Sequence, residues 1–229
     1  MSESPMMIHR ALRVFEYWNG ALVRRLLQPG MVAVDVGANK GDYSLMFARA
    51  VGRRGRVVAF EPDPENLLWL RKSLAANACQ WVEVLDVALA EHAGRATFYP
   101  GAKSGWGSLR ADHKRSDDRD PFEVAVRPLD DCLADLEIAD IDLLKVDVEG
   151  GDLAVLEGAR SLLSRSQRFT LLVDVDMKLS ADDRASMLDL LRSCGLTAWK
   201  IGQQLQPVQI LEAGQAICAS RLALGPSQR

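Results

Sequence analysis

Apolar residues along this chain recur with two periods, one typical of buried strands and one typical of amphipathic helices. Short apolar runs rich in valine and isoleucine predict strands, whereas apolar residues three and four positions apart predict helices. The predicted strands cover residues 31–36, 56–61, 81–87, 141–148, 169–176, 196–201 and 216–224. The predicted helices cover residues 6–27, 42–51, 64–77, 151–164 and 180–193.

The alternation of these strands and helices favours an α/β fold with a mostly parallel, seven-stranded sheet and helices on both faces. We expect a single domain over residues 1–229, which consists of four parts. These are the amphipathic helix 6–27, a first half of the sheet at 31–94, an insertion at 95–128 and a second half at 129–229. We expect this helix to pack over the sheet edge or over the ligand pocket, with a homodimer contact as the alternative.

The insertion interrupts the alternation. Residues 95–99 and 122–127 predict two short strands, and a polar segment at 100–120 separates them. A polar loop of this length inside a compact domain is either functional or simply solvated. As a lid, it would bring a set of polar and basic side chains to an acceptor molecule. This set is Lys103, Arg110, His113, Lys114 and Arg115.

Composition narrows the class of protein. The net charge of -3 and the pI of about 5.7 give no global basic field, so we expect no nucleic-acid partner. The four cysteines lack C-x-x-C spacing, which indicates reduced thiols rather than a zinc site or disulfides. The N-terminus has no signal-peptide pattern, and no apolar run reaches the ~20 residues of a membrane span. We therefore expect a cytoplasmic protein.

A glycine-rich turn follows the first predicted strand. Asp35, Gly37 and Gly41 form an acidic-x-G-x-x-x-G pattern, in which glycine lets the backbone turn sharply and approach a ligand. The helix that begins near Asp42 offers free N–H groups to anionic ligand groups. Glu61 ends the next strand, where a carboxylate can accept hydrogen bonds from ribose hydroxyls. The pattern indicates a nucleotide-cofactor site, although a structural glycine turn can have the same spacing.

A second constellation lies on the predicted strand 141–148. Strand alternation would place Lys145, Asp147 and Glu149 on one face. Ligands of open α/β sheets bind beyond the carboxyl ends of the strands, so these residues are candidates for catalysis. Asp147 is the first choice for a general base or an acceptor-positioning group, and Glu149 is the second. Lys145 would fix the geometry by pairing with Asp147 or Asp174. The open alternative is an ion-pair network that only joins strands.

Three blocks, in their order and spacing, resemble the FkbM family of S-adenosylmethionine (SAM)-dependent methyltransferases. They are the turn at 35–44, the segment 56–64, and the K-x-D-x-E-G run at 145–150 with the V-L-E-G-A run that follows it. Supporting pieces are Asp86-Val87-Ala88-Leu89, Gly107-Ser108-Leu109 and Leu129-Asp130. The resemblance covers roughly residues 31–176. The family usually has Glu where this chain has Asp152 and Asp174, and both changes shorten the side chain.

The resemblance implies a Rossmann-like class I methyltransferase fold. It implies transfer of a methyl group from SAM to a hydroxyl of a sugar or secondary metabolite, with S-adenosylhomocysteine as the product. The partner would be a small-molecule or glycan acceptor. Asp35 is expected to order the glycine turn by accepting its N–H groups, and Glu61 is expected to bind the ribose. The expected cofactor-binding residues are Asp35, Gly37, Ala38, Asn39, Gly41, Tyr43, Ser44, Glu61, Pro62, Asp86, Val87, Ser108 and Asp147.

Other interpretations predict different residues. A Mg²⁺ site at Asp147, Asp174 and Asp176 would use oxygen ligands on adjacent strand ends, but we expect no metal. An NAD(P)-dependent oxidoreductase would use the Y-x-x-x-K match at Tyr99 and Lys103, yet the proline between them prevents the required helix. A nucleic-acid methyltransferase would carry a basic stripe or an N/D-P-P-Y motif, and neither is present. A non-catalytic SAM-binding or scaffold protein remains open.

Overall fold

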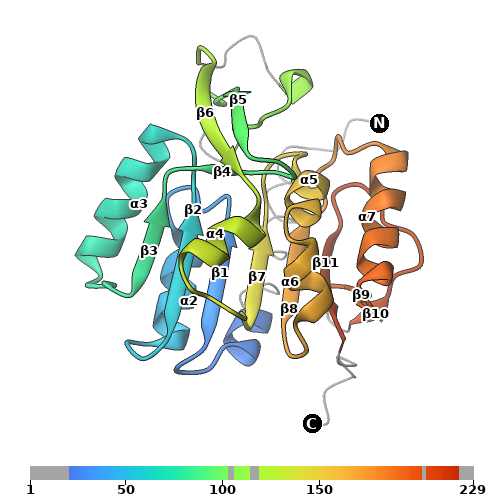
Figure 1. Ribbon diagram of the computed structural model, residues 1–229, viewed down its shortest axis with the longest axis horizontal. Coiled ribbons are helices and arrows are strands. Elements are labelled where there is room, and N and C mark those ends of the chain that lie inside the picture. Colours follow the sequence, from blue (N-terminus) through green and yellow to red (C-terminus); the bar gives the residue numbers. More distant parts are fainter. Residues whose placement is uncertain (1–20, 103–105, 114–118, 203–204, 222–229) are drawn as a thin grey trace.

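One large sheet forms the centre of the protein (Figure 1). The computed structural model describes residues 21–102, 106–113, 119–202 and 205–221. The sheet has eight strands in the order β10-β9-β11-β8-β7-β1-β2-β3. These strands are β1 (Val32–Val36), β2 (Arg56–Phe60), β3 (Val82–Leu85), β7 (Leu143–Val146), β8 (Thr170–Asp174), β9 (Thr197–Lys200), β10 (Gln206–Pro207) and β11 (Ala216–Ser220).

The prediction of a mostly parallel sheet is confirmed. The central strands β3, β2, β1, β7 and β8 pair in parallel, whereas β11 lies antiparallel between β8 and β9. The predicted number of seven strands is wrong by one. The eighth strand, β10, is a two-residue strand that pairs antiparallel with β9 at the sheet edge, and it is too short to show a hydrophobic period.

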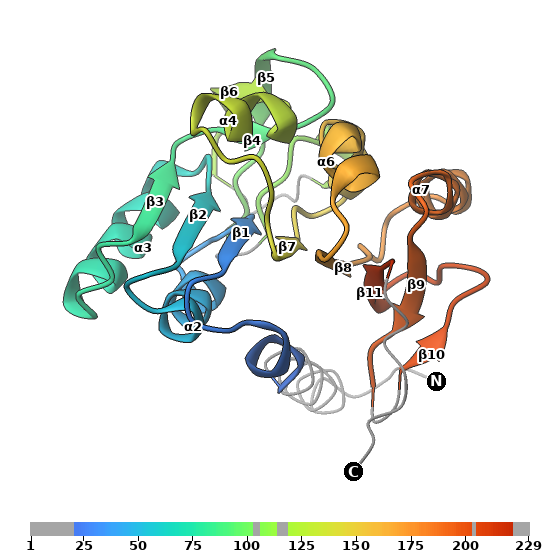
Figure 2. The same cartoon turned by 60° about the horizontal axis from the view of Figure 1, so that its bottom comes forward.

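Helices pack on both faces of the sheet, as the alternating pattern predicts (Figure 2). One face carries α2 (Asp42–Val51), α3 (Pro64–Ala76) and the helical residues 21–26. The other face carries α4 (Leu129–Asp135), α5 (Asp152–Glu157), α6 (Arg160–Arg165) and α7 (Ala181–Ser193). Neighbouring strand residues contribute to opposite faces: Ala33 packs with the first group and Val34 with the second. The rest of the predicted helix 6–27 and the end of the predicted strand 216–224 lie outside the described residues.

The insertion forms a second, three-stranded sheet above the carboxyl ends of β1 and β2 (Figure 1). Its strands are β4 (Ala88–Leu89), β5 (Gly94–Phe98) and β6 (Phe122–Arg127), and the single turn η1 (Ala111–His113) lies in the loop between β5 and β6. A small apolar core of its own holds this sheet together, at Ala88, Phe98, Val124 and Val126. Two of its strands match the prediction. The third strand, β4, was not predicted. The strand predicted at 81–87 ends early, because β3 stops at Leu85, and β4 then begins at Ala88.

The predicted helix 151–164 is wrong in its continuity, because the chain breaks near Gly158 into α5 and α6. A Cβ at Gly158 would lie 2.2 Å from the Ala90 carbonyl oxygen, so only glycine fits there. The Asp130 carboxylate then accepts hydrogen bonds from the N–H groups of Ser161 (2.8 Å) and Leu162 (2.9 Å). Asp130 thus caps α6 from a neighbouring segment, because α6 has no side-chain cap of its own.

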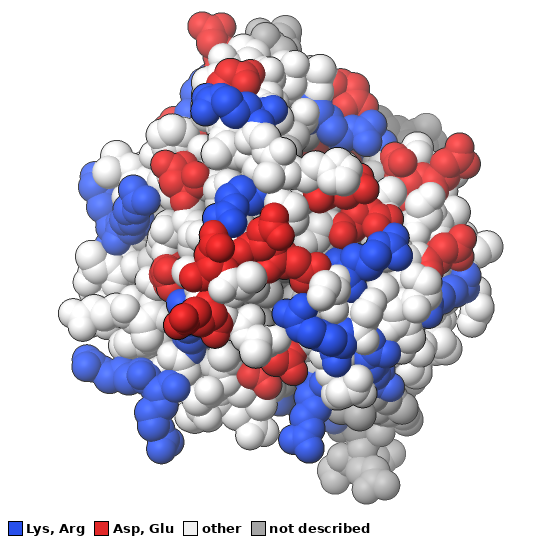
Figure 3. All heavy atoms as spheres, viewed as in Figure 1, with Lys and Arg blue, Asp and Glu red and all other residues white. Residues whose placement is uncertain are grey.

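Acidic side chains gather over α4 on the face shown in Figure 3, where this helix contributes Asp130, Asp131 and Asp135. Basic side chains lie beside this acidic group as well as toward the edges of that view. In the described part of the chain, every helix is too short or too polar to cross a membrane.

We expect Asp130→Ala to lower the free energy of unfolding by about 1–2 kcal/mol, because two N–H groups of α6 lose their acceptor. Urea unfolding followed by circular dichroism measures this change. The matched control is Asp131→Ala, an exposed neighbour, for which we expect a change of about 0.5 kcal/mol or less. Equal effects of the two substitutions would contradict the capping role.

Candidate active site

A cavity of about 400 Å³ lies at the carboxyl ends of β1, β2 and β7. Its walls come from the turns that follow these three strands, from the segment after β3 and from the insertion. The lining residues are Val36, Gly37, Ala38, Asn39, Asp42, Tyr43, Met46, Phe60, Glu61, Pro62, Asn66, Val87, Ala88, Leu89, Phe98, Gly107, Leu109, Lys145, Asp147, Val148, Glu149 and Gly151. This is the position at which open α/β sheets bind their ligands.

The glycine turn after β1 forms one wall of the cavity. Gly37 has a φ of +74°, and a Cβ there would lie 2.0 Å from the Asp147 carbonyl oxygen. Glycine is therefore required both for the backbone conformation and for the close approach of the segment after β7. The N–H groups of Gly37 and Ala38 both donate to the Phe60 carbonyl (3.0 Å each), which fixes the turn against the end of β2.

Glu61 organises this turn from the end of β2. Its Oε2 accepts a hydrogen bond from the Asn39 N–H (2.7 Å), and its Oε1 accepts from the Asp63 N–H (3.0 Å) and from Asn66 Nδ2 (3.3 Å). The side chain is buried, and burial raises its pKa above the usual value. The expectation that Asp35 accepts the N–H groups of the turn is therefore corrected: Glu61 accepts that of Asn39, while also lining the cavity.

Asp35 has a different partner. It is fully buried on β1, opposite Lys145 in the register of β1 and β7, and its Oδ1 lies 3.3 Å from Lys145 Nζ. Its Oδ2 accepts a hydrogen bond from Ser44 Oγ (2.6 Å). Lys145 Nζ also lies 3.5 Å from Asp147 Oδ2 and donates to the Gly37 carbonyl (3.1 Å). The expected ion pair between Lys145 and Asp147 is present, and Asp35 forms a second ion pair with the same lysine.

Lys145 remains protonated in this setting. Burial alone lowers its pKa, but the carboxylates of Asp35 and Asp147 raise the pKa by more, so the net value lies above that of an ordinary lysine. A permanently charged ammonium group cannot accept a proton. Lys145 is therefore suited to positioning Asp147 and the glycine turn rather than to acting as a base.

Asp147 and Glu149 reach the cavity from a turn, not from a strand. The predicted strand 141–148 is wrong at its end, because β7 stops at Val146 and Glu149 has a φ of +51°. Simple alternation along a strand therefore does not explain where Glu149 points. Burial, together with the charges of Asp147 and Asp176, raises the pKa of Glu149 to about 8.

Several residues expected at the cofactor lie outside the cavity lining. Ser44 is buried against Asp35, and Asp86 is exposed beyond β3. The Cβ position of Gly41 lies 2.6 Å from Leu70 Cδ1, so this glycine allows α3 to pack closely rather than facing a ligand. Ser108 is buried and donates to the Glu149 carbonyl (2.7 Å). The expected residues Gly37, Ala38, Asn39, Tyr43, Glu61, Pro62, Val87 and Asp147 do line the cavity.

Other lining residues were missed by the sequence analysis. They are Val36, Asp42, Met46, Phe60, Asn66, Ala88, Leu89, Phe98, Gly107, Leu109, Val148 and Gly151. Asn66 could have been found, because it lies one helical turn after the capping residue Asp63 and faces back toward Glu61. Phe98 could not, since its pattern is that of an ordinary strand residue in the insertion.

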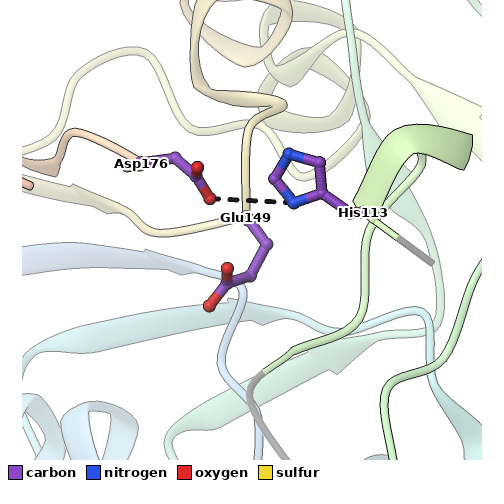
Figure 4. Close-up of side chains that lie close together, drawn as sticks. All are labelled: His113, Glu149 and Asp176. Carbon is purple, nitrogen blue, oxygen red and sulfur yellow. Dashed lines mark ion pairs between the residues drawn. The ribbon is translucent and has the colours of Figure 1, made fainter. Parts of the chain in front are cut away.

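Two of the three aspartates considered for Mg²⁺, Asp147 and Asp174, line one cavity, whereas Asp176 belongs to a different group of side chains. Asp174 lies with Lys145 and Asp147 on a smaller cavity, and burial with the charge of Asp147 raises its pKa to about 7. Asp176 instead faces His113 and Glu149 (Figure 4). Among the described residues, His113, Glu149 and Asp176 are the one group of three potential metal ligands with atoms within 4.8 Å of one another.

The insertion contacts the turn after β7 and the segment after β2, and both of these line the cavity. Ser108 binds the Glu149 carbonyl, and Arg119 forms ion pairs with Asp63 and Glu65 beside the Glu61 turn. Arg110 pairs with Asp112 and Asp183, and it is not among the residues that line the cavity. The other basic residues expected in the lid, Lys103, Lys114 and Arg115, lie outside the described residues.

Comparison with curated proteins finds methyltransferases. The chain is 26% identical over 191 residues to 2-O-methyltransferase NoeI of Sinorhizobium fredii, with 77% of each chain covered. It is 33% identical over 159 residues to the 31-O-demethyl-FK506 methyltransferase FkbM of Streptomyces tacrolimicus, with 58% of this chain and 60% of that protein covered. A 32% identical match to AMB antimetabolite synthetase AmbE of Pseudomonas aeruginosa covers 74% of this chain but 10% of that protein.

Solved structures share the fold. Methyltransferase FkbM from Methylobacillus flagellatus superimposes with a TM-score of 0.55 at 18% identity, over 87% of this chain and 50% of that chain. A SAM-dependent O-methyltransferase from Thermotoga maritima gives a TM-score of 0.51 at 15% identity, over 91% of this chain and 66% of that chain. The model of the methyltransferase FkbM domain matches residues 35–196. This chain therefore belongs to the FkbM family of SAM-dependent methyltransferases.

Proposed function

We propose that this protein transfers the methyl group of SAM to a hydroxyl group of a sugar or a secondary metabolite. The observation that carries the proposal is the cavity itself, in which the Gly37 turn and Glu61 face the turn with Asp147 and Glu149. A cofactor wall and a wall of potential proton acceptors thus meet in one space. The relatives named as 2-O- and 31-O-methylating enzymes support a hydroxyl acceptor.

The cofactor lies along the first half of the sheet in this proposal. The methionine portion of SAM contacts the turn at Gly37 and Asn39, and the ribose hydroxyls donate to Glu61. Glu61 Oε2 makes one hydrogen bond, to the Asn39 N–H, so it retains a lone pair for a ribose hydroxyl. The adenine lies beside Pro62 and Val87, which line the same cavity.

The acceptor approaches from the side of Asp147. Methyl transfer is an in-line displacement in which the acceptor oxygen, the methyl carbon and the sulfur must align, and positioning supplies much of the rate. An aliphatic hydroxyl becomes a good nucleophile when a nearby base takes its proton. Asp147 serves as this base or as the group that positions the hydroxyl. Lys145, held by Asp35, keeps the Asp147 carboxylate in place.

We expect Glu61→Gln to weaken binding of S-adenosylhomocysteine about 10- to 100-fold, because the amide presents a single acceptor oxygen to the turn and the ribose. Calorimetric titration of the folded protein measures this loss. The control is Asp86→Asn, whose side chain is exposed at the end of β3 and outside the cavity lining, and we expect its affinity to match the wild type. Wild-type affinity in Glu61→Gln would contradict the cofactor assignment.

We expect Asp147→Asn to retain binding of S-adenosylhomocysteine but to lower turnover about 10²- to 10⁴-fold, the range typical of a lost general base. Turnover is measured as formation of S-adenosylhomocysteine with a panel of sugars and hydroxylated metabolites, with Asp86→Asn as the control. A folded Asp147→Asn protein with normal rates would exclude the base. Tight cofactor binding by the wild type without turnover on any acceptor would favour a non-catalytic SAM-binding protein.

A further inference from the structure

His113, Glu149 and Asp176 come from three distant segments and meet at the edge of the cavity (Figure 4). His113 ends the η1 turn of the insertion, Glu149 follows β7 and Asp176 follows β8. Figure 4 shows the Asp176 carboxylate facing Nδ1 of the His113 ring. Glu149 lines the cavity, so the group adjoins the space assigned to the cofactor and the acceptor.

The backbone around these residues holds the three side chains in fixed positions. Ser108 Oγ donates to the Glu149 carbonyl (2.7 Å), which ties the insertion to the turn after β7. A Cβ at Gly150 would lie 2.7 Å from His113 Nε2, so the glycine makes room for the ring. Asp176 Oδ1 accepts a hydrogen bond from the Lys178 N–H, which leaves Oδ2 facing His113 Nδ1.

The two carboxylates lack a cationic side chain to balance their charge. Within the described residues, no side-chain nitrogen of a lysine or arginine lies within 4 Å of a carboxylate oxygen of Glu149 or Asp176. The nearby cations are engaged elsewhere: Arg110 pairs with Asp112 and Asp183, and Lys178 Nζ donates to the Asp112 carbonyl (3.3 Å). Glu149 and Asp176 are half-buried, and like charges at close range in such a setting are unfavourable unless a proton or a metal ion lies between them.

The separation of His113 and Asp176 leaves room for a metal ion, whereas Glu149 and Asp176 are close enough to share a proton. His113 Nδ1 lies 3.8 Å from Asp176 Oδ2, which is too long for a hydrogen bond. Ligands about 2.0–2.2 Å from one ion lie roughly 3–4 Å apart, so small movements would close the set around a cation. His113 is almost fully buried, with 6% exposed, and its imidazole ring offers a nitrogen lone pair of the kind that metal ions bind.

We propose that His113, Glu149 and Asp176 bind a divalent transition-metal ion at the edge of the cavity. One imidazole nitrogen with two carboxylate oxygens suits Mn²⁺, Fe²⁺ or Zn²⁺ better than Mg²⁺, which prefers oxygen ligands throughout. The site differs from the earlier Mg²⁺ candidate at Asp147, Asp174 and Asp176, since it retains Asp176 alone of the three. It also replaces the expectation that the protein uses no metal.

Three protein ligands leave coordination positions open to water or to an acceptor oxygen. Because Glu149 lines the cavity, an acceptor hydroxyl bound to the ion would lie beside the cofactor, where the ion favours loss of the hydroxyl proton. This role of the ion rests on the proposed methyltransferase function, whereas the binding site does not.

The test is a titration of the chelator-treated, dialysed full chain with Mn²⁺, followed by the electron paramagnetic resonance signal of free Mn²⁺. We expect a single tight site in the wild type and a loss of about tenfold or more in affinity in His113→Gln, since even changes to groups that only orient metal ligands cost that much. Asp176→Asn is expected to lose the same site. The matched control is His92→Gln, an exposed histidine paired with Glu91, which should bind Mn²⁺ like the wild type.

Binding of S-adenosylhomocysteine to the same samples separates the two proposals. Unchanged cofactor affinity in His113→Gln shows that the variant is folded, so its loss of Mn²⁺ then supports the metal site. Cofactor binding by a wild type that binds no Mn²⁺, or Mn²⁺ binding that His113→Gln leaves intact, would overturn the metal site and indicate a proton shared by the carboxylates. Mn²⁺ binding without cofactor binding would overturn the proposed function and leave the metal site standing.

Discussion

The ammonium group of Lys145 is the interaction on which the arrangement of the site depends. It is buried between β1 and β7 and contacts the Asp35 carboxylate, the Asp147 carboxylate and the Gly37 carbonyl. Removal of one member of a buried charge network leaves the others unpaired, which costs several kcal/mol. The same contact therefore joins two strands, holds the glycine turn and orients the candidate base.

This network gives a physical reason for two motifs that lie far apart in the sequence. The acidic residue before the glycine turn and the lysine of the K-x-D-x-E-G run are paired residues in the register of β1 and β7. Their side chains point to the same face of the sheet, where the Ser44 hydroxyl provides a further hydrogen bond to Asp35. Each motif thus contributes one charge to a buried ion pair. Loss of either residue would leave the other charge buried without its partner.

The insertion is a structural part of the site. Its own small apolar core holds its sheet together, and Ser108 and Arg119 join it to the turn after β7 and to the start of α3. The cavity therefore has walls from both halves of the large sheet and from the insertion. This arrangement places His113, a residue of a polar loop, beside carboxylates of the segments that follow β7 and β8.

The sequence by itself determined the type and order of most elements and the glycine turn that lines one side of the cavity, because hydrophobic period and glycine turns are local properties. Gly37, Asn39 and Glu61 line the cavity as their spacing predicts. The tertiary structure decided which polar groups meet. Asp35 faces Lys145 rather than the turn, Gly41 accommodates Leu70, and His113 joins Glu149 and Asp176. These contacts depend on strand register and on the path of the insertion, and neither can be recognised from the pattern of apolar residues in the sequence.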